Sequence, residues 1–186
     1  MKILFYCPFK FNLKSKNLSS LGGIESLNVE LCKEFIKRKF KVSLATYCHK
    51  EIKVNGLLNI PIKRINKKNK ESFDVIISSN EPSIFDKFEC KKNILWMHNT
   101  LSIEKSIRKK KLFPIIKNKI YAVYVSNYLK NKTSNLYFFN KKIVINNFLS
   151  KKFLNSSLNY QRKQIIVSVG VQSYGVACAS YADEQQ

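Results

Sequence analysis

Short apolar runs of strand length, separated by segments with helical periodicity, constrain the fold of this chain more than any other feature. Several runs are apolar throughout rather than alternating, which is typical of strands that are covered on both faces. Strands and helices in alternation predict an α/β fold in which a parallel sheet carries helices on both faces. The predicted strands are Ile3–Cys7, Val42–Thr46, Ile60–Ile65, Phe73–Ser78, Asn93–His98, Ile120–Ser126 and Ile143–Asn146.

The segment Gly23–Lys39 has the clearest helical pattern of the chain. Apolar side chains recur at spacings of three and four residues, at Ile24, Leu27, Leu31 and Phe35. An acidic residue in the first turn and basic residues in the last match the helix dipole at both ends. Two further helices are predicted, over Ser102–Lys111 and from Ser126 or Asn127 to about Leu136.

The charge of the chain is strongly unbalanced, with 34 Lys and Arg against 12 Asp and Glu and a formal net charge of +22. A surface this positive attracts phosphate, whether on nucleic acid, on anionic lipid or on a soluble nucleotide. The composition is also typical of an AT-rich genome, because Asn, Ile and Phe are abundant as well. Both explanations stay open, and the stretches Lys63–Lys70 and Arg108–Lys111 are predicted to be solvated.

The cysteines and the hydropathy of the chain indicate in which cellular compartment the protein is located. The five cysteines form no CxxC pair and no cluster with histidine, so no metal site is expected. Their odd number and their place in apolar runs favour free thiols in a reducing cytosol. The apolar start is too short for a signal peptide, and no stretch approaches the ~18 apolar residues of a spanning helix. We therefore expect a cytoplasmic protein whose contact with a membrane is at most peripheral.

Glycine and polar residues follow directly after several predicted strands, where parallel sheets bind their ligands. Gly22 and Gly23 open the best helix, with Glu25 in its first turn, and paired glycines let backbone N–H groups approach an anion. His98 and Asn99 close another strand, where a histidine can donate to a hydroxyl or pair with a phosphate. Ser126, Asn127 and Asn147 occupy equivalent places further along the chain.

Each of these signals also has a purely structural explanation. Paired glycines form flexible turns, a lone histidine often serves as a structural hydrogen-bonding residue, and Ser-Asn is a good helix cap. The patterns G-x-G-x-x-G and G-x-x-x-x-G-K-[ST] are absent, so neither a dinucleotide-binding fold nor a P-loop enzyme is supported.

The order of the motifs carries more information than any one of them. The chain presents Met1–Cys7, Gly22-Gly23-Ile24-Glu25, Phe73–Ile77, Ile94–Asn99, Val123–Lys130 and Ile143–Asn147 in succession. In this order they resemble the N-terminal, Rossmann-like domain of the retaining, group 1 (family 4) glycosyltransferases of the GT-B fold. Asn146-Asn147-Phe148 stands where that family has a Pro-Asn-Gly turn, so the glycine is missing. Ile165–Gly170 resembles the first strand of the family's second domain, and the resemblance covers about residues 1–170.

The resemblance implies an N-terminal domain over residues 1–160 and the start of a second domain over residues 161–186. It implies transfer of a sugar, with retention, from a nucleotide diphosphate sugar that serves as co-substrate, without metal or other cofactor. The acceptor would be a saccharide or lipid-linked molecule at an anionic membrane surface, and positive charge in the cleft would stabilise the departing diphosphate. Gly22 and Gly23 would contact the diphosphate, His98 would hydrogen-bond the transferred sugar or the phosphate, and Ser126 and Asn127 would line the cleft floor.

The last stretch of the chain differs in composition from the rest. The final basic residue is Lys163, and Val171–Gln186 is small, polar and patternless, which suggests a frameshifted or artificial tail. The acidic motif with which the family holds its donor has no counterpart there, so an inactive fragment is expected. For the glycosyltransferase no specific nucleic-acid partner is expected. Two alternatives remain: a non-catalytic basic domain that binds nucleic acid or an anionic polymer, and a broken gene product with no activity.

Overall fold

A computed structural model describes residues 1–11, 13, 21–65, 73–88, 90–100, 108, 112–133 and 139–148. All of them belong to one unit, Met1–Phe148. The predicted domain boundary at 160/161, the predicted strand near Gly170 and the tail lie outside the described residues. The same holds for the predicted helix Ser102–Lys111, apart from Arg108.

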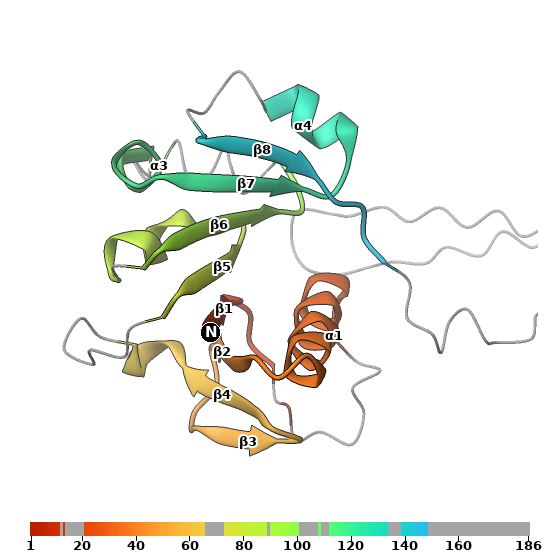
Figure 1. The fold of residues 1–186 in the computed structure, drawn as a ribbon, viewed down its shortest axis with the longest axis vertical. Helices are drawn as coiled ribbons and strands as arrows, with labels where there is room; N and C mark the ends of the chain where they lie inside the picture. The colour runs from red at the N-terminus through yellow and green to blue at the C-terminus, as the bar shows by residue number, and fades with distance from the viewer. Residues whose placement is uncertain are drawn as a thin grey trace, which may run out of the picture. The chain divides into compact units, whose positions relative to one another are not determined.

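The core of this unit is an eight-stranded sheet in the order β3-β4-β2-β1-β5-β6-β7-β8 (Figure 1). All neighbouring strands pair in parallel except β3 and β4. Without β3, the parallel strands follow the doubly wound order, which reverses between β1 and β5. The strands are β1 Lys2–Tyr6, β2 Lys41–Thr46, β3 Ile52–Val54, β4 Leu57–Pro61, β5 Val75–Ser79, β6 Lys92–Met97, β7 Ile120–Tyr124 and β8 Lys141–Val144.

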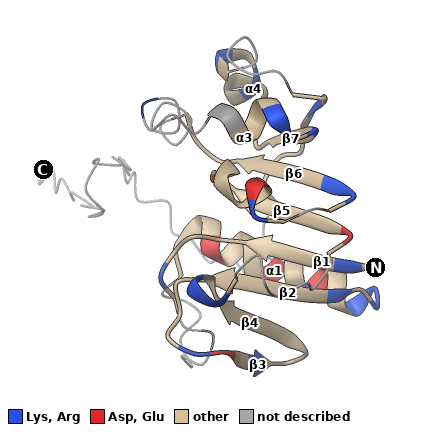
Figure 2. Ribbon diagram, turned by 90° about the vertical axis from the view of Figure 1, so that its left-hand side faces the viewer, with Lys and Arg blue, Asp and Glu red and all other residues tan. Residues whose placement is uncertain are grey.

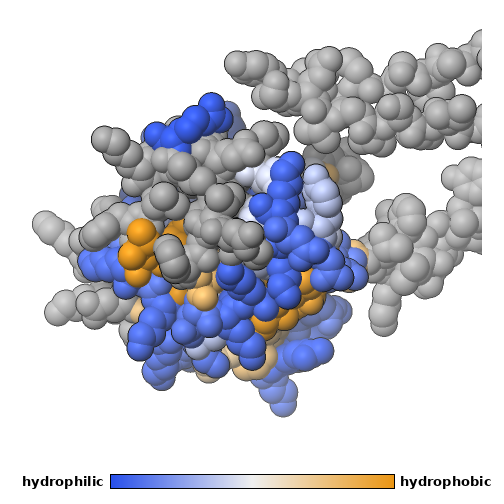
Figure 3. Space-filling view, turned by 90° about the horizontal axis from the view of Figure 1, so that it is seen from above, coloured by the Kyte–Doolittle hydropathy of each residue, from blue (hydrophilic) through white to orange (hydrophobic). Residues whose placement is uncertain are grey.

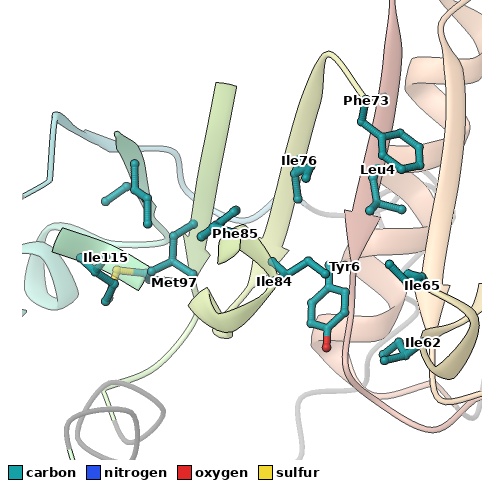
Figure 4. Close-up of a cluster of buried hydrophobic side chains, with 14 of the residues drawn as sticks. Leu4, Tyr6, Ile62, Ile65, Phe73, Ile76, Ile84, Phe85, Met97 and Ile115 are labelled. Atoms are coloured by element: carbon teal, nitrogen blue, oxygen red, sulfur yellow. The ribbon is translucent and has the colours of Figure 1, made fainter. Parts of the chain in front are cut away.

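Helices pack on both faces of the sheet, as the apolar runs predict. Along β1, Ile3 and Phe5 join Val29 and Cys32 of helix α1 (Gly23–Lys37) in a cluster on one face. The alternate residues of β1 join the cluster on the other face (Figure 4). That face carries the 3₁₀ helix η3 (Pro82–Asp86), α3 (Leu112–Lys117) and α4 (Asn127–Thr133), each of which contributes buried side chains. Each large apolar side chain buried in this way contributes about 1.5–3 kcal/mol.

Helix α1 ends two residues before its predicted end. The helix stops at Lys37, and Lys39 adopts a left-handed conformation with φ of 63°. Such a residue closes many helices, because it turns the chain away from the helix axis. The start of α4 at Asn127 agrees with the prediction, whereas its predicted end falls outside the described residues.

The predicted strand Ile60–Ile65 is wrong in its last four residues, and β4 begins three residues before the predicted start, at Leu57. The strand β4 ends at Pro61, and the chain continues as a 3₁₀ turn, η2, over Ile62–Arg64. The short strand β3 was not predicted, although Asn55-Gly56 is a strong hairpin signal. Asn55 and Gly56 have φ of 48° and 80°, as the two central residues of a type I′ turn require.

Two other departures concern short elements. The strand β8 lies two residues earlier than the predicted Ile143–Asn146. The strand begins with two lysines and its apolar pattern begins only at Ile143, so the sequence predicts its start two residues too late. Helices η3 and α3 were not predicted either, since each is too short to show helical periodicity.

Candidate functional site at the carboxyl ends of the strands

The predicted site residues lie along one edge of the sheet. Helix α1 follows β1 along the chain, and its start contains Gly22, Gly23 and Glu25. The other predicted residues follow β6, β7 and β8. Because these strands are parallel, their carboxyl ends meet at the same edge. Neighbouring strands are about 4.8 Å apart, so β6 lies about 10 Å from β1 and β8 about 19 Å from it. The structure therefore places the start of α1 and His98 at the same edge of the sheet, while Asn147 lies at the far end of this edge.

The start of α1 is less open to an anion than the sequence suggests. Gly22 is the N-cap with an ordinary φ of −63°, and no side chain caps the helix through a hydrogen bond. The Glu25 carboxylate folds back against Gly22, where it would collide with a Cβ at that position. A carboxylate in the first turn already compensates the positive end of the helix. A phosphate would have to displace Glu25, whereas a Cβ placed on Gly23 would meet no side chain of the described residues within 4 Å.

A buried polar pair fixes α1 to the central strand β5 beneath this turn. Asn28 is fully buried, and its Nδ2 donates to the Ile24 carbonyl oxygen at 2.8 Å and to Ser79 Oγ at 2.9 Å. Ser79 Oγ in turn donates to Asn28 Oδ1 at 3.1 Å. The strand order reverses beside β5, so this pair holds the first half of α1 at the place where doubly wound sheets bind ligands.

The turn after β5 holds the end of β6. Asn80 adopts a left-handed conformation with φ of 57°. Its backbone N–H donates to the Trp96 carbonyl oxygen at 3.0 Å, and its Oδ1 accepts from the His98 backbone N–H at 2.8 Å. Asparagine is one of the few residues that adopt this conformation readily. Asn80 therefore positions His98.

The His98 side chain lies against Trp96, with 4.5 Å between the ring centroids. Burial lowers the pKa of His98 from 6.5 to about 4, so the imidazole is neutral near pH 7. A neutral imidazole donates one hydrogen bond and accepts another but carries no charge. The expected contact of His98 with a sugar or phosphate would thus be a hydrogen bond, and not an ion pair.

Three buried polar atoms near His98 have no hydrogen-bond partner within the described structure. They are Asn80 Nδ2, Trp96 Nε1 and His98 Nε2. The other two unpartnered atoms are Asn59 Nδ2 on β4 and Tyr124 OH at the end of β7, the strand beside β6. Buried polar groups without a partner are rare in native proteins, and each calls for a water, an ion or a ligand. Their concentration around one ring marks the ends of β5 and β6 as the best candidate binding site.

Sequence reasoning found His98 but missed the residues that surround it. Trp96 is the only tryptophan of the chain, and it lies in the predicted strand, where it reads as a core residue. Asn80 follows a predicted strand in the same way as His98, so its position was a usable signal. Asn28 and Ser79 are 51 residues apart, and no local pattern connects them.

The remaining predicted residues have structural roles or lie at the surface. Ser126 Oγ accepts from the Leu129 backbone N–H at 3.1 Å, so the hydroxyl caps α4. Asn127 and Asn147 are exposed. Asn99 is exposed as well, directly after His98. These placements are compatible with the lining of a cleft, but none of the four has an unpartnered buried atom.

Positive charge gathers at the opposite edge of the sheet, where the strands begin (Figure 2). Helices α1 and α3 also end there. The positive side chains at this edge, which we call the basic edge, are Lys2, Lys37, Arg38, Lys39, Lys41, Lys91, Lys92, Lys117, Lys119 and Lys141.

The candidate site, by contrast, is close to neutral. Around the start of α1 and the ends of β1, β5 and β6, the described charged residues are Lys10, Glu25 and Glu81. The expected positive charge in the cleft is therefore not found among the described residues. Within the same residues, no three His, Cys, Asp or Glu side chains gather in a way that could hold a metal ion. No described helix is long and apolar enough to cross a membrane.

Comparison of the chain with known proteins assigns it to no family. No protein-family model matches the chain, and no curated protein does so either.

Proposed function

We propose that this chain is the N-terminal part of a retaining glycosyltransferase, which transfers a sugar from a nucleotide diphosphate sugar to a saccharide or lipid-linked acceptor. The observation that carries the proposal is the group of unpartnered polar atoms on Asn80, Trp96 and His98. They lie one strand from the point where the strand order reverses, at the edge where doubly wound sheets bind ligands.

The chemistry of this group suits a hydroxyl-rich ligand. The Asn80 amide and the Trp96 indole offer N–H donors, and the neutral His98 ring can accept a hydrogen bond from a sugar hydroxyl. The described charges suit a phosphate less well, because the carboxylates of Glu25 and Glu81 outnumber the single lysine, Lys10. We therefore assign the sugar, rather than the diphosphate, to the ends of β5 and β6.

A matched pair of histidine variants tests the proposal. His98→Phe keeps a ring against Trp96 and removes the hydrogen bond, whereas His49→Phe changes an exposed histidine after β2. Ligand-observed NMR with a panel of UDP-, GDP- and ADP-sugars and of free saccharides should show binding to the unchanged protein. His98→Phe should weaken it about fivefold to tenfold, the effect of one lost hydrogen bond. Binding of no member of the panel, or equal losses in both variants, would refute the proposal.

The alternative is a non-catalytic domain that binds nucleic acid, favoured by the charge of +22. Single-stranded nucleic acids are usually bound by aromatic side chains that form a stacking platform. The exposed aromatic residues of the described structure are Tyr47, Tyr128 and Phe148, and they lie in three separate segments. They form no such platform, so binding to nucleic acid would rest on phosphate contacts and would weaken steeply with salt.

A further inference from the structure

The outer strand β8 presents a sheet edge that the proposed reaction does not use. It is the last strand of the described sheet, so no described strand pairs with its outer side (Figure 1). Consecutive residues of a strand direct their backbone N–H and C=O groups to opposite sides. The Ile145 backbone N–H donates to the Tyr124 carbonyl oxygen on β7 at 2.9 Å, so the N–H and C=O groups of Val144 point outward. Such an edge is a template for pairing with another chain.

The side chains around Val144 are apolar and partly exposed. Ile143 and Ile145 are 37% and 57% exposed, although isoleucine is among the residues most often buried. Both lie on the face of the sheet that carries α1, because Ile143 pairs in register with Val123, which packs in the cluster of that face. Figure 3 looks onto the end of the sheet that carries β8 and α4, where hydrophobic surface occurs in separate patches. The edge therefore offers a small apolar contact surface.

The sequence of this edge is symmetric about Val144. Two lysines, at positions 141 and 142, precede the apolar residues 143–145, and two asparagines follow at positions 146 and 147. An antiparallel partner of the same sequence places apolar residues opposite apolar residues and each lysine opposite an asparagine. Lys142 of one copy is then four residues, about 14 Å, from Lys142 of the other along the strands. Repulsion between edge lysines, which keeps many natural sheet edges apart, is therefore weak in this arrangement.

We propose that two copies of this chain pair through β8, antiparallel and centred on Val144, so that their two sheets join into one. The two Val144 residues exchange N–H to C=O hydrogen bonds across a two-fold axis. On the α1 face, Ile143 of each copy lies opposite Ile145 of the other, which is the kind of cross-strand contact that stabilises neighbouring strands. A pairing of so few residues is much smaller than the interface of a permanent dimer, so the dimer forms reversibly.

The net charge of the chain gives this association a characteristic salt dependence. Two copies with a formal charge of +22 each repel one another, and added salt screens that repulsion. The contacts at β8 are apolar or between backbone groups, so salt leaves them intact. The dimer should therefore become more stable as salt is added. Binding to a polyanion shows the opposite dependence, which separates the dimer from association through a shared nucleic acid.

Sedimentation velocity of the full chain, at several protein and salt concentrations, measures the dimer directly. Val144→Pro removes the outward N–H, and proline is tolerated on an edge strand at such a position. Circular dichroism should show that this variant folds, and it should weaken the dimer at least about tenfold. Ile145→Ser should weaken it by a similar factor, whereas Ile116→Ser, which changes an exposed isoleucine of α3, should have no effect. A protein that stays monomeric, equal effects of the two serine variants, or weaker association at high salt would overturn the proposal.

Introduced cysteines test the register of the pairing. The Cα atoms of the two Val144 residues should be about 5.5 Å apart, within the range that a disulfide spans, so Val144→Cys should give a covalent dimer under mild oxidation. Asn147→Cys should give no more than the unchanged protein, because six residues, about 20 Å, separate the two copies of that position. The opposite result would exclude this pairing. The candidate sites lie at opposite edges of the joined sheet, so sugar binding at His98 should be the same in every variant, and this test is independent of the proposed reaction.

Discussion

The pair formed by Asn28 and Ser79 gives the sharpest test of how α1 is held above the sheet. Replacement of Asn28 by Leu keeps the volume and the helix but removes both hydrogen bonds of Nδ2 and the one accepted by Oδ1. A hydrogen bond contributes about 1 kcal/mol net, and a buried hydroxyl left without a partner costs about 1–3 kcal/mol. We therefore expect Asn28→Leu to lower the free energy of unfolding by about 2–4 kcal/mol.

The double variant Asn28→Leu with Ser79→Ala measures the coupling free energy between the two side chains. Ser79→Ala alone should cost about 1–2 kcal/mol, because it leaves Asn28 with only the Ile24 carbonyl as a partner. Once Asn28 is Leu, the hydroxyl of Ser79 is unsatisfied, so its removal should then cost little or even stabilise the protein. The cost of the double variant should fall short of the sum of the single costs by at least about 1 kcal/mol.

Urea unfolding, followed by circular dichroism, measures each of these free energies. A useful control is Thr46→Val, because Thr46 Oγ1 donates to Asn59 Oδ1 at 3.0 Å and shares no partner with Asn28. Thr46→Val and Asn28→Leu should add within about 0.5 kcal/mol. A coupling between Asn28 and Ser79 no larger than this control would refute the conclusion that the pair fastens α1 to β5.

Three further predictions follow from backbone conformation and burial. Gly23→Ala should stabilise the fold by about 0.4–1 kcal/mol, because the position is helical and open. Gly56→Ala should destabilise it by about 1–2 kcal/mol, because φ is 80° there. Shifts of the urea midpoint in the same direction for both variants would contradict this. The pKa of His98 is lowered from 6.5 to about 4, so the unfolded chain binds more protons between these values, and the free energy of unfolding should decrease as the pH falls through them. His98→Phe should flatten that decrease in urea titrations at several pH values, and an unchanged slope would show that His98 is not buried as described. Trp96→Phe removes an indole N–H that has no partner among the described residues and leaves space in the buried cluster around it, so it should cost about 1–3 kcal/mol of stability and also weaken sugar binding; titration calorimetry that found sugar binding unchanged would show that the indole is not part of the site.

Most of the sheet could be predicted from the sequence because apolar runs report burial locally. Six of the eight strands, β1, β2, β5, β6, β7 and β8, lie within about two residues of their predicted places, and α1 begins where predicted. The failures have local causes as well. The strand β3 is only three residues long, and β4 ends at Pro61, before the apolar run ends.

Only part of the candidate site could be predicted from the sequence in the same way. His98 was found because it follows a buried strand, and parallel strands bring such residues to one edge whatever their order. The partners of His98 come from a different strand and from the interior of its own strand. A search for polar residues after strands could have found Asn80, but not Trp96.

The sequence by itself determined the class of fold, the edge of the sheet at which the candidate site residues lie and the size of the net charge, since each depends on composition or on patterns a few residues long. The tertiary structure decided the order of the strands, the contacts of Asn28 with Ser79 and of Asn80 with His98, and the gathering of lysines at the basic edge. These features depend on which strands become neighbours, and that choice follows from packing between residues far apart in the chain. Lysines at the starts of five strands are scattered from position 2 to position 141 in the sequence, and only the parallel register aligns them in one row.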